Sequence, residues 1–317
     1  MSIAELPLAD VATKHSVFHQ ILVATDFSQT SERAFAEALM IARENHAQLS
    51  LVHVMNIDWR YQVLENPPEI DLEEQDAQQR VKAFINALAP GEQIAATLVR
   101  HGPVAQSVAS LASQQGADLL VMGTRGRGGL SKLALGSTAE EILRIAPCPV
   151  LTVGPQAEIT PSQNPFPIIL FATDFGKGSA EALKVALSLA QTKRAKLILL
   201  HMTALMPATS TSFPAYTPAM PTADDVQAWQ SSSRTTCLLQ LKACIPEGLR
   251  LEREPAFVAG TDFCPEGILT AADRYKVDLI VMGANHSASP KMVAHIPWTA
   301  VHEVVRKAPC PVLTVAG

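Results

Sequence analysis

The sequence predicts an α/β protein made of two tandem copies of one parallel-sheet unit. Blocks of sequence recur in the same order along the 317 residues. ILVATDFS at 21–28 returns as ILFATDFG at 169–176, and APCPVLTV at 146–153 is repeated unchanged at 308–315. A repeat of this length indicates two copies of one folding unit. Within each copy, short apolar runs alternate with longer amphipathic stretches, which is typical of a sheet covered by helices on both faces.

The first copy contains five apolar runs that predict strands. Several are apolar at nearly every residue, as strands buried on both faces of a parallel sheet are. The predicted strands are ILVAT at 21–25, QLSLVHV at 48–54, IAATLVRH at 94–101, LLVMG at 119–123 and PVLTV at 149–153. Helices are expected between them at 29–45, 72–89, 103–115 and 137–145. Right-handed crossovers follow for parallel strands joined in this way.

The second copy repeats this order. Its strands are expected near 168–172, 196–202, 250–258, 278–283 and 311–315. The segment 154–167 between the copies holds four prolines, which stiffen the chain and remove hydrogen-bond donors. The boundary is therefore placed there, with one domain at 17–154 and the other at 165–317. The Pro-, Ser- and Thr-rich stretch 203–225 predicts a loosely packed or disordered flap, with a functional lid as the alternative.

Composition excludes several classes of protein. The net charge of −5 and the pI near 6.0 supply no general basic surface for nucleic acid. No apolar run reaches the roughly 18 residues that a membrane-spanning helix needs. The first 16 residues lack the charged start and apolar centre of an export signal. Five cysteines, an odd number without framework spacing, fit a reducing cytoplasm.

Two strand ends of the first copy are expected at the ligand-binding edge of the sheet. In an open parallel sheet this edge lies beyond the carboxyl ends of the strands. Ala24, Thr25 and Asp26 end the first strand, where the Asp26 carboxylate can accept hydrogen bonds from a ribose or an adenine amino group. The alternative is that Asp26 caps the following helix. Val54 ends the second strand and would either form an apolar wall for a base or pack in the core.

A glycine-rich stretch follows the fourth strand of the first copy. Gly123 and Gly126 are followed, after nine residues, by Gly136, Ser137 and Thr138. Glycine lets backbone N–H groups approach phosphate oxygens without a Cβ in the way, and the start of a helix favours an anion. Arg125, Arg127 and Lys132 add positive charge. The alternative is a flexible turn followed by an ordinary Ser/Thr cap.

Other signatures of phosphate or catalytic chemistry are missing. The sequence contains no GxxxxGK[ST], no GxGxxG in the first strand–helix turn, no GxSxG and no HExxH. No histidine or carboxylate is placed as a general base beside the glycines.

Taken together, these residues resemble the universal stress protein family in its tandem two-domain form. The motifs are ATDFS at the first strand, HV at the end of the second, and VMGTRGRGGL, LGST and APCPV in the last third of the copy. The resemblance implies a five-stranded, adenine-nucleotide-hydrolase-like α/β/α sandwich. It further implies that the last strands, 149–153 and 311–315, join the two halves as a pseudo-dimer, and a further homodimer is left open.

The ATP-binding branch of that family carries the pattern G-2x-G-9x-G-S/T, which Gly123, Gly126, Gly136 and Ser137 match. The resemblance therefore implies that the first copy binds ATP, with Mg²⁺ as the expected divalent cation. The residues expected to contact the nucleotide are Ala24, Thr25, Asp26, Val54, Met122, Gly123, Arg125, Gly126, Gly136, Ser137 and Thr138.

The second copy departs from this pattern. His286 stands in place of Gly126, and Trp298 and Thr299 replace Gly136 and Ser137. Because a tryptophan would block the phosphate oxygens, only the first copy is expected to bind ATP. His286, His295 and His302, with Asp262 and Cys264, form a weak candidate metal site without recognised spacing.

The cysteines have an ordinary structural interpretation. Cys148 and Cys310 precede the last strands and are expected to pack as small apolar groups, as are Cys237 and Cys244, which share one helix face. Cys264 is the cysteine to test for reactivity.

Three functions compete. The first is a cytoplasmic nucleotide-binding stress or regulatory protein, in which ATP changes a surface seen by an unknown protein partner. The second is a slow metal-dependent ATPase or phosphotransferase that uses the same pocket. The third is a nucleotide-free interaction scaffold. The glycines favour the first function over the third, and the missing catalytic base favours the first over the second.

Overall fold

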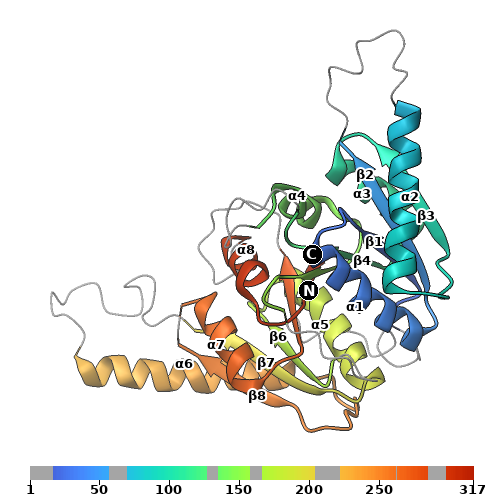
Figure 1. Cartoon of the computed structure of the whole chain (residues 1–317). Helices are drawn as coiled ribbons and strands as arrows, with labels where there is room; N and C mark the ends of the chain where they lie inside the picture. The colour runs from blue at the N-terminus through green and yellow to red at the C-terminus, as the bar shows by residue number, and fades with distance from the viewer. Residues whose placement is uncertain are drawn as a thin grey trace. The chain divides into compact units, whose positions relative to one another are not determined.

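The computed structural model describes residues 17–56, 70–126, 135–157, 166–203, 222–261, 263–284 and 298–317. It confirms the α/β fold, with mostly parallel strands and alternating helices (Figure 1). Contacts divide the chain into two compact units. The first unit holds 14–165 together with 305–316, and the second is built from 166–304. No helix in the described ranges has both the length and the apolar character needed to cross a membrane.

The sheet of the first unit follows the order β3-β2-β1-β4-β5-β10. Its strands are β1 (Gln20–Ala24), β2 (Gln48–Met55), β3 (Ala96–His101), β4 (Leu119–Gly123), β5 (Val150–Val153) and β10 (Val312–Ala316). The strands of the first repeat pair in parallel. β10, the last strand of the second repeat, pairs antiparallel with β5, and Leu313 lies opposite Leu151.

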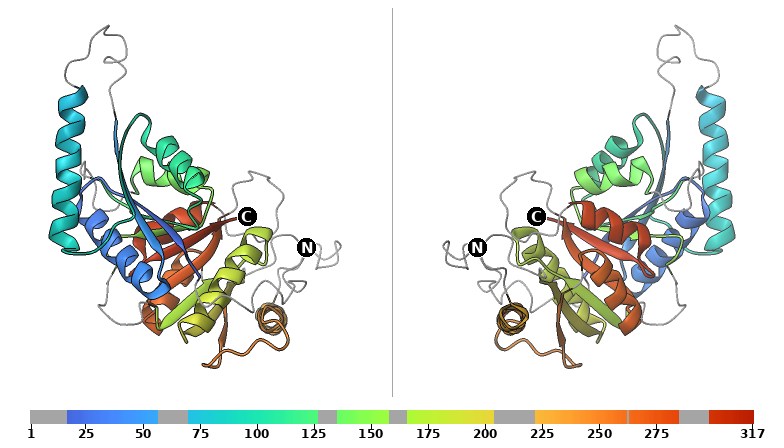
Figure 2. Two further views of the ribbon diagram at one scale, coloured as in Figure 1. Left: turned by 90° about the vertical axis from the view of Figure 1, so that its right-hand side faces the viewer. Right: turned by 90° about the vertical axis from the view of Figure 1, so that its left-hand side faces the viewer.

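Four helices connect the strands of the first repeat. They are α1 (Gln29–Asn45), α2 (Ile70–Leu88), α3 (Val104–Gln114) and α4 (Ser137–Ile145). α1 and α2 cover one face of this sheet, and α3 and α4 cover the other (Figure 2). The predicted helices 29–45 and 137–145 agree with α1 and α4 at both ends, and the other two differ by one or two residues.

The strand order places a binding crevice between β1 and β4. From β1 the chain proceeds to β2 and β3 on one side, and from β4 it proceeds to β5 on the other side. The connections leave in opposite directions at this point, so the loops after β1 and β4 separate beyond their carboxyl ends. Both strands are buried at their centres, where Leu22, Val23, Leu120 and Val121 have no exposed surface.

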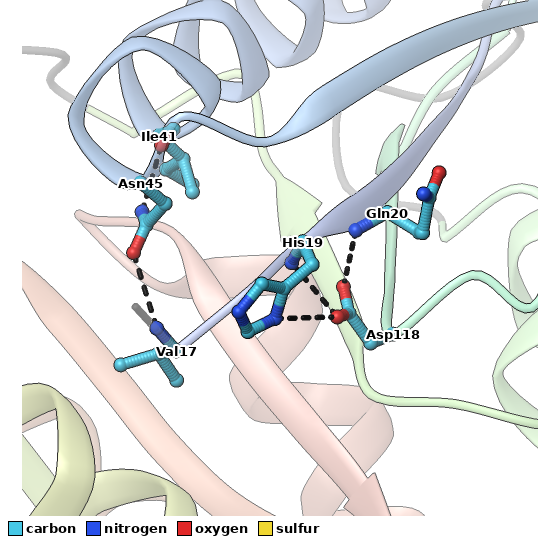
Figure 3. Close-up of polar contacts among 6 residues, drawn as sticks. All are labelled: Val17, His19, Gln20, Ile41, Asn45 and Asp118. Carbon is cyan, nitrogen blue, oxygen red and sulfur yellow. Dashed lines mark hydrogen bonds and ion pairs between the residues drawn. The ribbon is translucent and has the colours of Figure 1, made fainter. Parts of the chain in front are cut away.

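The opposite, amino-terminal edge of the sheet is held by polar side chains (Figure 3). The Asp118 carboxylate precedes β4 and accepts hydrogen bonds from the backbone N–H groups of His19, at 2.8 Å, and Gln20, at 3.0 Å. Asn45, at the end of α1, accepts from the N–H of Val17 and donates to the carbonyl of Ile41. These bonds fix the entry of the chain into β1, since the first backbone donors of that strand are paired.

The second unit contains the parallel order β9-β6-β7-β8. Its elements are β6 (Ile168–Ala172), α5 (Lys177–Thr192), β7 (Lys196–Met202), α6 (Ala223–Ala243), β8 (Ala256–Gly260), α7 (Glu266–Tyr275) and β9 (Leu279–Ala284), and α8 (Trp298–Lys307) follows. The predicted strand at 250–258 was wrong in its first part. Residues 252–254 are charged and exposed, and Pro255 lacks an N–H for the ladder, so β8 begins at Ala256.

Asp118→Ala should destabilise the protein by about 1–3 kcal/mol, because two backbone N–H groups lose their acceptor. Urea denaturation followed by circular dichroism measures the change. Asp273→Ala is the matched control, since the Asp273 side chain is 75% exposed and pairs with the neighbouring Lys276 on the surface, and it should change stability little. Equal stabilities for the two variants would contradict the role given to Asp118.

Candidate functional site

A cavity of about 560 Å³ opens beyond the carboxyl ends of β1, β2 and β4 and at the amino end of α4. This volume lies in the range of small-ligand sites. All eleven residues that the sequence indicates line it: Ala24, Thr25, Asp26, Val54, Met122, Gly123, Arg125, Gly126, Gly136, Ser137 and Thr138. Segments more than a hundred residues apart in the chain therefore meet at the switch point. Arg127 and Lys132 lie outside the described residues.

The turn after β1 is shaped by its own side chains. Phe27 has a left-handed backbone, with φ of 61°. Two local hydrogen bonds hold this bend: the Phe27 N–H donates to the Thr25 hydroxyl at 3.0 Å, and the Ser28 N–H donates to Asp26 Oδ1 at 3.0 Å. Such side-chain-to-backbone bonds two residues apart are a common way to stabilise a sharp turn.

The interpretation of Asp26 as a helix cap is wrong. The residue that caps α1 is Ser28, whose side chain accepts from the Ser31 N–H. Asp26 instead lies before the cap and lines the cavity, and its Oδ2 atom faces Gly126. A Cβ at Gly126 would come within 2.9 Å of that oxygen. The missing side chain at Gly126 thus leaves room for the carboxylate that projects into the site.

A histidine at the end of β2 fixes the same turn from the other side. His53 Nδ1 donates to the Thr25 carbonyl at 2.7 Å, and its ring packs on Phe27 with centroids 4.4 Å apart. Phe27 in turn contacts Phe84 of α2. The second unit repeats the arrangement: His201 Nδ1 donates to the Thr173 carbonyl at 2.7 Å and the ring packs on Phe175. This contact belongs to the framework of both units.

Gly123, Gly126 and Gly136 lack a side chain for different structural reasons. A Cβ at Gly123 would lie 2.8 Å from the backbone of Thr30 and Ser31, so this glycine permits close packing of β4 on the first turn of α1. Gly126 makes room for Asp26. A Cβ at Gly136 would lie 3.4 Å from the Thr124 carbonyl oxygen and meet nothing closer. Gly136 is therefore the one whose missing side chain has no packing reason among the described residues.

α4 begins at the cavity with no side-chain cap. Gly136 is its N-cap and makes no side-chain hydrogen bond, so the alternative of an ordinary Ser/Thr cap is wrong. Ser137 and Thr138 are the first helical residues, and both line the cavity. The N–H groups of a first helical turn and the helix dipole favour an anion at this position.

Sequence reasoning missed two groups of site residues. The first is an apolar wall, formed by Val52, Val104, Val108 and Ile142 from outside the motifs and by Leu135 from the LGST motif. The second is a pair of hydroxyls beside the cavity at the start of α1: Ser28, its N-cap, and Thr30 both donate to the carbonyl of Arg125, which lines the cavity. An available signal was the internal comparison, because the second repeat has Gly176 and Gly178 at these positions.

The corresponding turn of the second unit differs in its polar contacts. The Asp174 carboxylate accepts from the Gly176 N–H at 2.8 Å and from the Ser179 hydroxyl at 2.5 Å. In the first unit the equivalent Ser31 hydroxyl donates to the Ser28 carbonyl instead. Gly283 packs on Gly178 as Gly123 packs on Thr30. Asp174 is thus tied to its own helix, whereas Asp26 accepts only a backbone N–H among the described hydrogen bonds.

The candidate metal ligands mostly lie outside the described residues. Asp262, His286 and His295 lie outside the described residues, and Cys264 and His302 lie within them. Among the residues that the structure does describe, no three His, Cys, Asp or Glu side chains gather as metal ligands would.

Burial makes Cys264 a poor nucleophile. Burial, followed by the charges of Glu266 and Asp174, raises the pKa of Cys264 to about 11, so its thiol stays protonated near neutral pH and lacks the low pKa of a reactive cysteine. Cys237, Cys244 and Cys310 are buried, as expected for small apolar groups. Cys148 is only partly buried.

Comparison with known proteins gives consistent matches. The model of the universal stress protein family matches residues 18–154 and again residues 165–316. A universal stress protein of Thermus aquaticus is 35% identical over 139 residues, which cover 43% of this chain and 99% of that protein. The crystal structure of a universal stress protein from Archaeoglobus fulgidus matches in fold, with a TM-score of 0.59 at 19% identity, over 94% of this chain and 98% of that one. A universal stress protein solved in complex with cAMP matches 44% of this chain and 98% of its own, at 23% identity and a TM-score of 0.35.

We expect His201 to make the protein less stable as the pH is lowered from neutral. Burial lowers the pKa of His201 from its ordinary value of 6.5, and the Thr173 carbonyl and Asp174 oppose this effect only in part. The unfolded chain therefore binds more protons than the native state below about pH 6.5, so stability decreases as the pH falls through this window. His201→Gln should flatten the dependence of the melting temperature between about pH 7.5 and about pH 5.

His46→Asn is the control for this experiment. His46 is exposed and has a left-handed backbone that asparagine tolerates. Its pH dependence should match that of the wild type. An unchanged slope in His201→Gln would show that His201 is not the group responsible.

Proposed function

This chain belongs to the universal stress protein family, and on that premise we propose that it is a stress-response or regulatory protein whose first unit binds ATP. Occupancy of the site would alter a surface that a protein partner or a second chain recognises. The observation that carries the proposal is the convergence of the predicted residues on one cavity at the switch point of the sheet. This is where open parallel sheets bind their ligands.

The apolar part of the cavity suits a purine base. Val52 and Val54 come from β2, Val108 from α3, Met122 from β4 and Ile142 from α4. Val54 is 8% exposed, so it packs in the core and lines the site at once. Asp26 adds one carboxylate at the edge of this wall, which can accept hydrogen bonds from a ribose or from an exocyclic amino group.

The polar part of the cavity suits a chain of phosphates. Gly126, Gly136, Ser137 and Thr138 border it with backbone and hydroxyl groups, and Arg125 supplies a positive charge. Backbone N–H groups at the start of a helix bind anions without any specialised side chain. The apolar and the phosphate-binding parts belong to one cavity, as a single nucleotide requires.

The donor set also fits Mg²⁺ brought with the phosphates. Asp26 is the one carboxylate among the described lining residues, and Ser137 and Thr138 provide hydroxyl oxygens. Mg²⁺ in nucleotide sites typically takes one or two carboxylates and draws its other ligands from phosphates and water. When bound, the ion would neutralise phosphate charge, while the residues of this chain hold and orient the nucleotide.

Binding is favoured over hydrolysis as the main activity. Phosphoryl transfer to water needs a residue that orients or deprotonates the nucleophile. The described lining residues include no histidine and a single carboxylate, Asp26, which the proposal already uses as an acceptor for the nucleoside or as a ligand of Mg²⁺. Slow hydrolysis remains the second candidate function, with Arg125 as the residue that would stabilise charge.

The proposal assigns ATP to the first unit alone. Sequence supports this, because His286 and Trp298 stand where Gly126 and Gly136 stand in the first repeat. The described turn supports it too: the Asp174 carboxylate is held by Ser179 of its own helix. The equivalent of the nucleoside acceptor is therefore already engaged.

We also propose a cytoplasmic location and an intrachain pseudo-dimer. All five cysteines are free thiols, which fits a reducing compartment. The antiparallel pairing of β10 with β5 supports a junction of the two repeats through their last strands.

Titration calorimetry should give one ATP per chain for the purified protein, because only the first repeat keeps the glycines at 126 and 136. Two equivalent sites would contradict the assignment to the first unit. No binding of ATP in the presence of Mg²⁺ would contradict the proposed function as a whole.

Gly136→Val should weaken ATP binding by at least about tenfold, which corresponds to about 1.4 kcal/mol. The backbone of Gly136 has φ of −66°, which valine can adopt, and the nearest atom of the described residues to an added Cβ is 3.4 Å away. The fold should therefore survive, and the added methyl groups should meet the phosphates. Gly136→Ala should lose less affinity than Gly136→Val, and equal affinity in all three proteins would contradict phosphate binding at this glycine.

A further inference from the structure

We propose that the hydroxyls of Ser28 and Thr30 are positioning groups, which orient the peptide between Arg125 and Gly126 for phosphate binding. They act through the Arg125 carbonyl, which they hold against α1, and not by contact with the nucleotide. The inference rests on the proposed function, since it concerns how the same site takes the triphosphate. The pair of hydroxyls with the Arg125 carbonyl is called the hydroxyl clamp.

The clamp saturates one carbonyl oxygen. Ser28 Oγ donates to it at 3.0 Å and Thr30 Oγ1 at 2.5 Å. A carbonyl oxygen has two lone pairs, so two donors fill its capacity. Thr30 is only 7% exposed, which shields its bond from competition by water.

Because the peptide group is planar, fixing the Arg125 carbonyl also fixes the direction of the Gly126 N–H. In a planar trans peptide, the N–H of one residue points opposite to the carbonyl of the residue before it. Because the Arg125 carbonyl is directed at α1, the Gly126 N–H is directed away from α1. Without the clamp, the peptide between Arg125 and Gly126 could turn and present a carbonyl oxygen, whose partial negative charge repels phosphate.

The second repeat provides an internal comparison. Gly176 and Gly178 occupy the positions of Ser28 and Thr30, and Gly176 caps α5 without any side-chain hydrogen bond. The surrounding framework is the same, because Gly283 packs on the first turn of α5 as Gly123 packs on that of α1. The repeat that has His286 in place of Gly126 therefore also lacks both hydroxyls. The two hydroxyls thus occur in the repeat that has the glycine pattern, and glycines replace them in the repeat that shares only the framework.

Thr30 is the better residue for a test. Ser28 also caps α1, so its replacement would destabilise the helix directly. Thr30→Val keeps the size and branching of the side chain and removes only the hydroxyl, whereas Thr30→Ser keeps the hydroxyl.

The experiment compares the affinities of ATP with Mg²⁺ and of adenosine, by titration calorimetry, in the wild type, Thr30→Val and Thr30→Ser. Thr30→Val should bind ATP about fivefold to tenfold more weakly, the effect of one lost hydrogen bond. Its affinity for adenosine should not change, because adenosine has no phosphates to meet the loop. Thr30→Ser should restore ATP binding. Melting temperatures confirm that each variant is folded.

Thr235→Val is the matched control. Thr235 lies on α6, and its hydroxyl also donates to a backbone carbonyl, that of Ser231, at 2.9 Å. The same chemical change there should leave both affinities unaltered.

Three results would overturn the clamp. The first is that Thr30→Val binds ATP with the same affinity as the wild type. The second is that it loses affinity for ATP and for adenosine to the same extent, which a general structural role predicts. The third is that Thr30→Ser does not restore ATP binding. If the wild type itself binds adenosine but not ATP, or binds neither, the proposed function fails first and the clamp fails with it.

Discussion

The close approach of a strand end to the first turn of a helix is the constraint on which the site depends. Gly123 lies so near the backbone of Thr30 and Ser31 that a Cβ would reach within 2.8 Å of it. This contact brings the start of α1 beside the loop after β4, so hydroxyls of α1 reach the Arg125 carbonyl. The same approach, between Gly283 and Gly178, recurs in the second unit. A glycine that resembles a ligand contact in sequence is therefore first a packing requirement.

The two repeats share a framework and differ in the polar contacts of the turn that follows the first strand. In both units a histidine donates to the carbonyl of the threonine that ends the first strand, and packs on a phenylalanine with a left-handed backbone. These contacts explain why the Thr-Asp-Phe sequence occurs in both copies regardless of ligand. The differences begin one residue later, where Ser28 corresponds to Gly176. Both aspartates accept from the backbone N–H two residues on, and Asp174 accepts in addition from the Ser179 hydroxyl.

The sequence predicts the fold well because its signals are local and repeated. The bounds of α1 and α4 follow from periodicity, and the cavity residues follow from glycines at strand ends. The missed features depend on contacts that no local pattern contains. β8 begins late because Pro255 and a charged run outweigh the apolar residues around them. Which residue caps a helix depends on the turn before it, so Ser28 rather than Asp26 caps α1. The clamp joins residues 95 and 97 positions apart, which only the folded chain brings together.

Recognition through main-chain groups separates ligand binding from folding in this architecture. Backbone N–H groups exist at every position except proline, so such a site is defined by where side chains are missing and by what holds the loop in place. Among the described residues, Gly136 has no packing reason for its missing side chain, and the strand–helix contact recurs at Gly283 in the second unit, where Gly178 stands in place of Thr30. A repeat can therefore lose these features and keep its strands, its turn and its histidine contact. The second unit has this combination, so the similarity of the two repeats reflects their common framework and does not require a common ligand.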